Sequence, residues 1–342
     1  MKETSYYAHI PKFETSFPEI ILYAIRTLSE DKSGIDSFTA IIDDKDYTIN
    51  RGDKITDILD SWFKIKYDIN PNSNLPFKND DEKLKFYIIL LREENSCFAK
   101  YAFSLALTVK DYLAKHKDVQ LLIFPECSLT GYPPRDISNS SCVNFNLVQS
   151  MCDRLQSVAD QNDISFIVGT IFKEKEIYNR ALLFQPNKQI KSYDKRALWG
   201  WDNDNFAKGN SDGIVEIDGV VFGIRICFEI RFPEFFRELY KRNTDINVVL
   251  FYDVADTDDK ERYSMIRGHL QTRAVENVTT TISVNATSPF QTAPTMVFGK
   301  SGQCIKECVR NKPELLIYDF EKTVNDFGEN GRTSISDSLI NW

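Results

Sequence analysis

The chain has 342 residues, of which 42% are hydrophobic and 13% aromatic, enough for one large domain or one large and one small domain. Its formal net charge of −8, with a pI near 5.2, argues against the broad basic surface that nucleic-acid binding requires. No stretch approaches 18 consecutive apolar residues, and the first residues, MKETSYYAHIPK, lack the apolar core of a signal peptide, so no membrane association is expected.

The use of cysteine and histidine indicates a reducing compartment and argues against a metal site. The seven cysteines have no C-x-x-C spacing, and their odd number does not suit a disulfide framework. Only three histidines are present, which disfavours a histidine-based zinc site and a Ser-His-Asp triad. We therefore expect a cytoplasmic protein without a metal.

The first eighty residues carry short, mixed patterns. Helical spacing of apolar residues occurs at 20–30 and 55–66, and residues 37–54 have the pattern of a strand, a polar turn and a second strand. The stretch 70–83 is rich in Pro, Asn and Asp, which is typical of a linker. We predict a small N-terminal α/β appendage over 1–80, whose role the pattern leaves open.

From residue 84 the pattern becomes regular, with apolar strands alternating with amphipathic helices. Strands are predicted at 85–91, 119–126, 164–172, 178–186, 190–195, 246–252, 278–286 and, shorter, near 295–299, 303–308 and 314–320. Helices are predicted at 97–117, 144–161, after Pro233 and at 261–277, and a hairpin at 214–227 around Asp218-Gly219. This mixture predicts a layered α/β domain with a mixed sheet over 84–320, followed by a C-terminal extension, 321–342.

Three reactive side chains each stand at the end of a predicted strand, namely Glu126, Lys195 and Cys227. Strand ends are where a rigid backbone presents side chains to a shared site. A cysteine becomes a nucleophile when its thiolate is stabilised, and a carboxylate is able to take up the thiol proton and pass it to a leaving amine. A lysine is suited to stabilising the oxyanion that forms on the attacked carbonyl.

The segments around these residues resemble those of a known family. FPECSLTGYPPRD (124–136), YDKRAL (193–198) and ICFEIRFPE (226–234) are similar to the glutamate, lysine and cysteine segments of the nitrilase superfamily of carbon–nitrogen hydrolases, in its amidase branch. FIVGT (166–170), YNRALLF (178–184), FAKG (206–209) and RAVEN (273–277) resemble accessory segments of that family. GYPPRD also resembles the glutaminase half of glutamine-dependent NAD synthetases.

The resemblance implies a four-layer α-β-β-α sandwich that cleaves a non-peptide carbon–nitrogen bond without a cofactor. Glu126 would be the general base and Cys227 the nucleophile that forms a thioester. Lys195 and the backbone N–H of Phe228 would stabilise the oxyanion. The resemblance also implies a homodimer or higher homo-oligomer formed through 233–242 and 261–277, with a small molecule as substrate.

One position departs from the family pattern. Many members carry a second glutamate between the lysine and the cysteine, and here Asp202, or alternatively Asp204, stands near that place. Four further residues are candidates for the substrate pocket: Tyr132, Glu229, Arg231 and Asp253. Asp253 or Asp256 in the acidic stretch 253–261 would favour a cationic substrate.

Three functions remain open from the sequence. The first is a hydrolase of small amides or related substrates, with nitrile and carbamoyl compounds not distinguished from amides. The second is a catalytically weak, nitrilase-like binding or regulatory module. The third is a glutaminase that supplies ammonia to another enzyme.

Overall fold

The computed structural model of the chain describes residues 5–9, 37–42, 45–50, 53, 57, 118–287, 290–312 and 314–340. The chain forms two compact units, Met1–Lys117 and Asp118–Trp342. The predicted boundary between an appendage ending at 80 and a domain beginning at 84 lies outside the described residues, and it stays a prediction.

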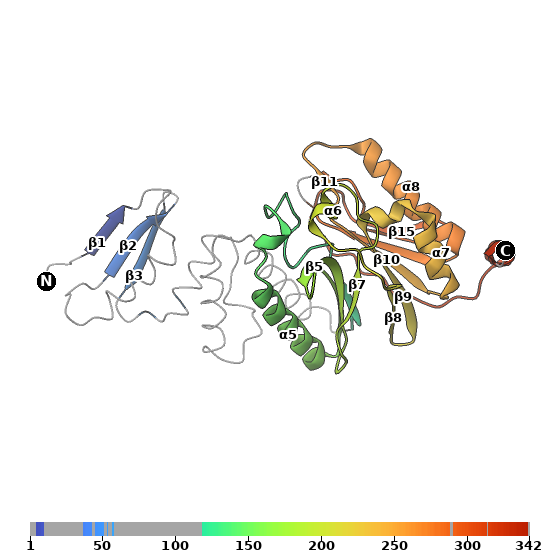
Figure 1. The fold of residues 1–342 in the computed structure, drawn as a ribbon, viewed down its shortest axis with the longest axis horizontal. Coiled ribbons are helices and arrows are strands. Elements are labelled where there is room, and N and C mark those ends of the chain that lie inside the picture. The colour runs from blue at the N-terminus through green and yellow to red at the C-terminus, as the bar shows by residue number, and fades with distance from the viewer. Residues whose placement is uncertain are drawn as a thin grey trace. The chain divides into compact units, whose positions relative to one another are not determined.

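The first unit contains a three-stranded sheet (Figure 1). Strand β1 (Ser5–His9) pairs in parallel with β2 (Ser37–Ile42), which pairs antiparallel with β3 (Lys45–Asn50). The strand–turn–strand prediction for 37–54 is thereby confirmed. The predicted helices at 20–30, 55–66 (apart from residue 57) and 97–117, the linker at 70–83 and the strand at 85–91 lie outside the described residues.

The second unit begins with a four-stranded sheet in the order β4-β5-β6-β7. It contains β4 (Leu121–Ile123), β5 (Ser165–Lys173), β6 (Ile177–Phe184) and β7 (Lys191–Asp194). Strands β4 and β5 are parallel and the other pairs are antiparallel, so the sheet is mixed. Helix α5 (Phe145–Asn162) packs against β5, and it begins where the side chain of Asn144 accepts a hydrogen bond from the Leu147 N–H.

A six-stranded sheet follows, in the order β15-β14-β12-β10-β9-β8. Its members are β8 (Ile214–Ile217), β9 (Val220–Ile226), β10 (Ile246–Phe251), β12 (Thr280–Asn285), β14 (Met296–Phe298) and β15 (Cys304–Glu307). The predicted hairpin is confirmed, because Asp218 and Gly219 both have positive φ and join β8 to β9. Helices α7 (Pro233–Lys241) and α8 (Lys260–Asn277) cover this sheet, and β11 (Val254–Ala255) pairs with β13 (Phe290–Gln291) beside it.

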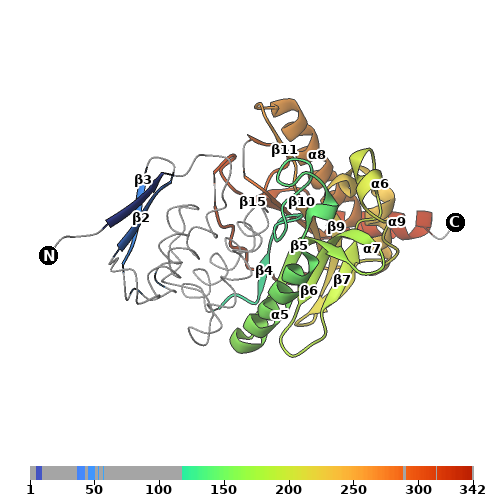
Figure 2. The same ribbon diagram turned by 60° about the vertical axis from the view of Figure 1, so that its left-hand side comes forward.

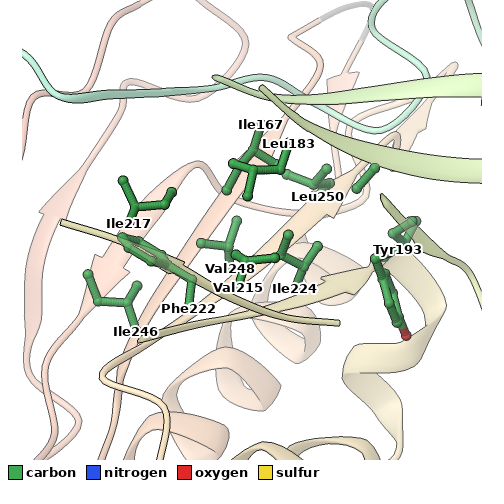
Figure 3. Packing of buried hydrophobic residues seen from close by; sticks show 12 residues of the cluster. Ile167, Leu183, Tyr193, Val215, Ile217, Phe222, Ile224, Ile246, Val248 and Leu250 are labelled. Atoms are coloured by element: carbon green, nitrogen blue, oxygen red, sulfur yellow. The ribbon is translucent and has the colours of Figure 1, made fainter. Parts of the chain in front are cut away.

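Two apolar cores hold these layers together. The first lies between the two sheets, where Ile167 and Leu183 of one sheet meet Ile224, Val248 and Leu250 of the other (Figure 3). The second lies between the six-stranded sheet and its helices. Figures 1 and 2 show α5 on one side of the paired sheets and α7 with α8 on the other. The predicted four-layer α-β-β-α sandwich is confirmed.

The structure corrects two predicted elements and adds others, among them two α-helices. The strand at 119–126 shortens to Leu121–Ile123, because Pro125 has no N–H to donate to a ladder. Residues 314–320 form no strand in their described part, since they run along the surface with Leu315 and Ile317 exposed. The added helices are α6 (Trp201–Asn205), within the domain, and α9 (Phe327–Ile340), within the C-terminal extension.

Within the described ranges, none of the helices combines the length and the apolar character that a membrane crossing requires.

Candidate active site

Cys227 stands at a sharp turn where β9 ends and the short 3-10 helix η3 (Cys227–Arg231) begins. Its φ is +48°, a left-handed conformation that costs a side chain other than glycine or asparagine about 1 kcal/mol or more. The turn keeps the half-buried thiol at the carboxyl end of the six-stranded sheet, above the fully buried Ile226 and Ile230. A strained, well-packed turn of this kind is typical of a nucleophile.

The carboxylate of Glu229 holds this turn in place from below. It is fully buried, and it accepts hydrogen bonds from the Tyr193 hydroxyl (2.8 Å) and the backbone N–H groups of Ile226 (2.7 Å), Arg196 (2.7 Å) and Ala197 (3.3 Å). These bonds join the Cys227 turn to the segment that follows Lys195. Because its oxygens are already engaged, the geometry favours a positioning role for Glu229 over the predicted contact with substrate.

Lys195 follows β7 directly and is almost wholly buried, with 1% of its side chain exposed. Its Nζ lies 3.0 Å from Oε1 of Glu126 and 2.7 Å from Oδ2 of Asp202. A buried ammonium group is stable only with such partners, because desolvation alone would neutralise it. Two carboxylates therefore share one lysine, and the cluster as a whole is anionic.

Glu126 is held by three donors from three elements. Its Oε1 accepts from Lys195 and from Nδ2 of Asn179 (2.7 Å), and its Oε2 accepts from the backbone N–H of Tyr252 (2.8 Å). Asn179 was not among the predicted site residues, although its segment was noted as an accessory one. An asparagine is unusual inside a buried strand, and this feature of the sequence could have indicated that Asn179 has a polar partner in the site. The contact of the Tyr252 N–H could not be predicted from the sequence, because every residue other than proline has a backbone N–H.

The turn that carries Glu126 is pressed against β5. Gly169 is the contact point, since a Cβ at this position would lie 2.2 Å from the Pro125 oxygen and 2.6 Å from Cα of Glu126. The Gly169 carbonyl also accepts hydrogen bonds from the Leu129 N–H (3.1 Å) and the Ser128 hydroxyl (3.2 Å). The close approach therefore sets the position of the Glu126 backbone.

Of the two candidates for the fourth member, Asp202 contacts Lys195 and Asp204 does not. Helix α6 directs the buried Asp202 toward Lys195, whereas Asp204 is exposed. The other carboxylate oxygen of Asp202 accepts a hydrogen bond from the Tyr132 hydroxyl (2.9 Å). The Tyr132 ring stacks on Tyr252 with 4.9 Å between centroids. Burial, assisted by the charge of Glu126, raises the pKa of Tyr132, so its hydroxyl stays protonated and donates to Asp202.

The remaining predicted residues have other partners within the domain. The amide of Phe228 is in the first turn of η3, where backbone N–H groups have no partner within the helix. The guanidinium of Arg231 lies over the Phe228 ring and against the Met265 sulfur of α8. Asp253 follows β10 and forms an ion pair with Arg262, and the exposed Asp256 pairs with Arg135. Among the residues that the structure describes, no group of His, Cys, Asp and Glu is arranged to hold a metal ion.

The charges around Cys227 determine its protonation state. Burial raises the pKa of the thiol, the carboxylate of Glu126 raises it further, and Lys195 opposes both without reversing the direction. Burial lowers the pKa of Lys195, but the charge of Glu126 and that of a thiolate at Cys227 outweigh it, so the net direction is upward. At neutral pH the site therefore holds a thiol beside an ammonium group, and attack must be coupled to removal of the thiol proton.

This protonation state predicts the pH dependence of alkylation. Since the pKa of the Cys227 thiol lies above its ordinary value, its reaction with iodoacetamide is expected to be slow at pH 7 and to keep accelerating beyond pH 9. The folded state favours the thiol form, so the stability that this group contributes is lost as the pH rises through the folded pKa. Time-resolved mass mapping of the Cys227 peptide between pH 6 and 10 measures the rate. A plateau below pH 7 would instead indicate a preformed thiolate–ammonium pair.

The sequence and the fold of the chain are similar to those of known proteins. A sequence profile of the carbon-nitrogen hydrolase family matches residues 85–326. The 2-oxoglutaramate amidase of Bacillus subtilis (strain 168) is 29% identical over 179 residues, covering 51% of this chain and 65% of that protein. An (R)-stereoselective amidase of Pseudomonas sp. is 25% identical over 186 residues, covering 54% and 65%. The similar stretch thus spans slightly less than two thirds of each relative.

Two further comparisons bear on the function and the fold. The glutamine-dependent NAD(+) synthetase of Acinetobacter baylyi is 28% identical over 143 residues, which is 40% of this chain and 26% of that protein. Among solved structures, a variant of the amidase from Nesterenkonia sp. AN1, with acrylamide added at its active-site cysteine, superposes with a TM-score of 0.55 at 23% identity. It covers 67% of this chain and 90% of that one. This likeness concerns the fold.

Proposed function

The chain belongs to the carbon–nitrogen hydrolase family, and we propose that within it the protein hydrolyses small amides through a thioester on Cys227. One observation carries the proposal. The buried Lys195 ammonium is bonded to Glu126 and Asp202 at the same time, and the charges of all three act on a cysteine at a strained turn. An ion cluster that served only stability would not require a cysteine with positive φ at the end of a strand.

In the first half of the reaction, Glu126 takes the proton from the Cys227 thiol as the sulfur attacks the amide carbon. The oxyanion that forms receives hydrogen bonds from the Lys195 ammonium and the Phe228 N–H. Glu126 then passes its proton to the nitrogen as the carbon–nitrogen bond breaks, and ammonia or an amine leaves. The three hydrogen bonds to Glu126 keep its carboxylate oriented through both proton transfers.

In the second half, Glu126 removes a proton from water, and the hydroxide attacks the thioester carbonyl. The same oxyanion donors act again, and collapse of this intermediate releases the acid and returns the proton to the sulfur. The bond between Asp202 and Lys195 fixes the ammonium group through both halves. The shorter side chain of Asp202, compared with a glutamate, is accommodated by α6 and by the Tyr132 hydroxyl.

Intact-mass spectrometry tests the proposal. The protein is mixed with a panel of small amides, nitriles, carbamoyl compounds and glutamine, and quenched at short times. Amide hydrolysis predicts a mass increase equal to the acyl group, mapped to the Cys227 peptide and absent after prior alkylation with iodoacetamide. A silent panel would contradict the proposal and favour a binding or regulatory module. An adduct with glutamine alone would favour the ammonia-supplying function to which the NAD(+) synthetase similarity points.

Replacing Asp202 tests the fourth member of the cluster. Asp202→Asn keeps the shape but removes the charge that bonds Lys195 at 2.7 Å, a charge-assisted bond worth about 1.5–3 kcal/mol. We expect kcat to fall roughly 10- to 100-fold. Asp204→Asn, two residues away and exposed, is the matched control and should change kcat less than about twofold. Equal kcat values for the two variants would remove Asp202 from the mechanism.

We also propose that the protein forms a homodimer through α7 and α8. Both helices lie on the outer face of the six-stranded sheet, and Phe232 and Met265 are exposed apolar side chains at this face. Sedimentation velocity of the wild type and of a Met265→Asp variant measures the assembly. A wild-type monomer at micromolar concentration would contradict the proposal.

A further inference from the structure

The carboxylate of Asp253 is not free to attract a cation. It is 8% exposed, and it accepts hydrogen bonds from Nε (3.1 Å) and Nη2 (3.0 Å) of Arg262 and from the Thr292 hydroxyl. Its backbone is fixed by Asn285, which accepts from the Asp253 N–H (2.9 Å) and donates to the Asp253 carbonyl (2.8 Å). A guanidinium already covers this carboxylate, which argues against the expectation that Asp253 selects a cationic substrate.

Arg262 presents its other edge outward. Its side chain is 43% exposed, although its partner is buried. Within the part of the chain that the structure describes, the bonds to Asp253 use Nε and one side of Nη2. A guanidinium has five N–H donors in a planar fork, so the remaining donors face away from Asp253. A buried carboxylate that orients an arginine in this way prepares it for a second, bidentate acceptor.

The arginine is linked to the reacting groups by a short path. The backbone N–H of Tyr252 donates to Oε2 of Glu126. Asp253, which holds Arg262, is the next residue in the chain. Burial lowers the pKa of Arg262, but its bond with Asp253 and the negative charge of a thiolate at Cys227 raise it, and the net direction is upward. The guanidinium therefore stays charged within the electrostatic field of the nucleophile.

A second cationic side chain, that of Arg231, lies near Arg262. Arg231 lies four residues after Cys227, and its guanidinium touches the Met265 sulfur, which is one turn of α8 beyond Arg262. Its guanidinium contacts this sulfur and the Phe228 ring, neither of which is anionic. The pair formed by Arg262 and Asp253 is neutral, and Arg231 adds one positive charge near it, while Asp259 and Glu261 at the start of α8 are acidic.

The loop formed by residues 253–259 does not need the Arg262 side chain to hold its conformation. Arg135 pairs with Asp256 at 2.7 Å, and Arg310 pairs with Asp258 and also donates to the Gln291 carbonyl. The side chain of Asp259 accepts from the backbone N–H of Arg262 and so caps α8. Residues 253–259 are therefore held by several bonds that do not involve the Arg262 side chain.

We propose that Arg262, oriented by Asp253 and Thr292, binds a carboxylate of the substrate, so that the protein prefers amides carrying a carboxylate a few atoms from the scissile carbonyl. This inference rests on the proposed amide hydrolysis and specifies its substrate class. Arg262 is then a specificity-determining residue, and Asp253 is the residue that positions it.

A matched substrate series tests the preference. The three amides have the same chain length and differ in their terminal group: the monoamide of glutaric acid, pentanamide and 5-aminopentanamide. We expect kcat/KM of the wild type to be roughly 10- to 100-fold higher for the anionic amide than for the neutral one, and lower still for the cationic one. Equal values for the anionic and the neutral amide would overturn the inference.

Substitutions assign the preference to Arg262. In Arg262→Gln the ratio of anionic to neutral kcat/KM should fall at least about tenfold, and in Arg262→Lys it should lie between the two, because a lysine keeps the charge without the fork. Arg267→Gln is the control, since Arg267 lies on the same helix and pairs with Glu307, and it should leave the ratio unchanged. An unchanged ratio in a folded Arg262→Gln protein would overturn the assignment.

A binding measurement separates this inference from the proposed function. Titration calorimetry of the Cys227→Ala variant with the monoamide of glutaric acid measures affinity without chemistry. Binding should weaken at least about tenfold when Arg262→Gln is added. If no amide acylates the wild type but this charge-dependent binding is present, hydrolysis fails and the inference on Arg262 stands. If acylation occurs without any such binding difference, the inference fails and hydrolysis stands. If neither is found, both are overturned.

Discussion

Replacement of Glu126 by glutamine is expected to lower kcat by at least 100-fold and up to about 10⁴-fold, the range that a positioned general base contributes. The variant keeps the shape of the side chain but loses the basic oxygen. It also disturbs the cluster, because an amide nitrogen at the Oε1 position would face Nζ of Lys195 and Nδ2 of Asn179, both donors. We therefore also expect a loss of about 1–3 kcal/mol in the free energy of unfolding.

Single-turnover kinetics with intact-mass detection, together with urea unfolding, measure both effects. Glu216→Gln is the control, because Glu216 is an exposed glutamate on β8 and its loss should change neither quantity appreciably. A Glu126→Gln protein that retained more than a tenth of wild-type kcat would show that another group accepts the thiol proton.

Replacement of Lys195 by methionine should have the larger effect on stability. The variant leaves Glu126 and Asp202 buried without their shared cation, and removing one partner of a buried ion pair costs about 3–5 kcal/mol. The melting temperature of a unit of this size should fall by roughly 6–20 °C. Activity should be lost as well, since the ammonium group is the proposed oxyanion donor.

The pH dependence of this loss has a definite sign. In the wild type the pKa of Lys195 is raised, so its contribution is fully present below the ordinary lysine pKa of about 10.4 and is lost only as the pH rises through the higher folded value. In Lys195→Met the two buried carboxylates repel each other without their shared cation, and uptake of a proton relieves this repulsion, so the variant regains stability as the pH falls. The difference in melting temperature should therefore shrink between pH 8 and pH 5.

Thermal unfolding at several pH values measures this difference. Lys191→Met, at an exposed lysine on β7, the strand that leads to Lys195, is the control and should shift the free energy of unfolding by less than about 0.5 kcal/mol at every pH. A difference for Lys195→Met that stayed constant or grew toward pH 5 would mean that the two carboxylates do not carry the penalty.

The geometry of the cluster shows how an aspartate reaches Lys195. From the sequence alone its side chain is one methylene short. In the structure, Gly200 has a positive φ, and α6 starts at once and brings the Asp202 backbone close enough for a 2.7 Å bond to Lys195. The Tyr132 hydroxyl, which comes from the turn after Glu126, occupies the other oxygen.

The sequence by itself determined the layered fold of the second unit, and it singled out the three residues of the proposed mechanism. Continuous apolar runs such as 164–172 specify a strand buried on both faces, and the Asp218-Gly219 pair specifies a tight hairpin, because both depend on residues close together in the chain. Glu126, Lys195 and Cys227 were recognisable because each ends such a strand and lies within a segment similar to those of one family.

Only the tertiary structure decided how these residues are partnered. The Tyr252 N–H reaches Glu126 across 126 positions of sequence, and Asn179 reaches it across 53. The sequence did not show that Arg262 covers the carboxylate of Asp253, because the packing of α8 places this arginine and no local pattern does. Local periodicity specifies which face of an element is apolar, but a buried charge takes its partner from whichever element packs against it, and that is settled only when the two sheets and their helices come together.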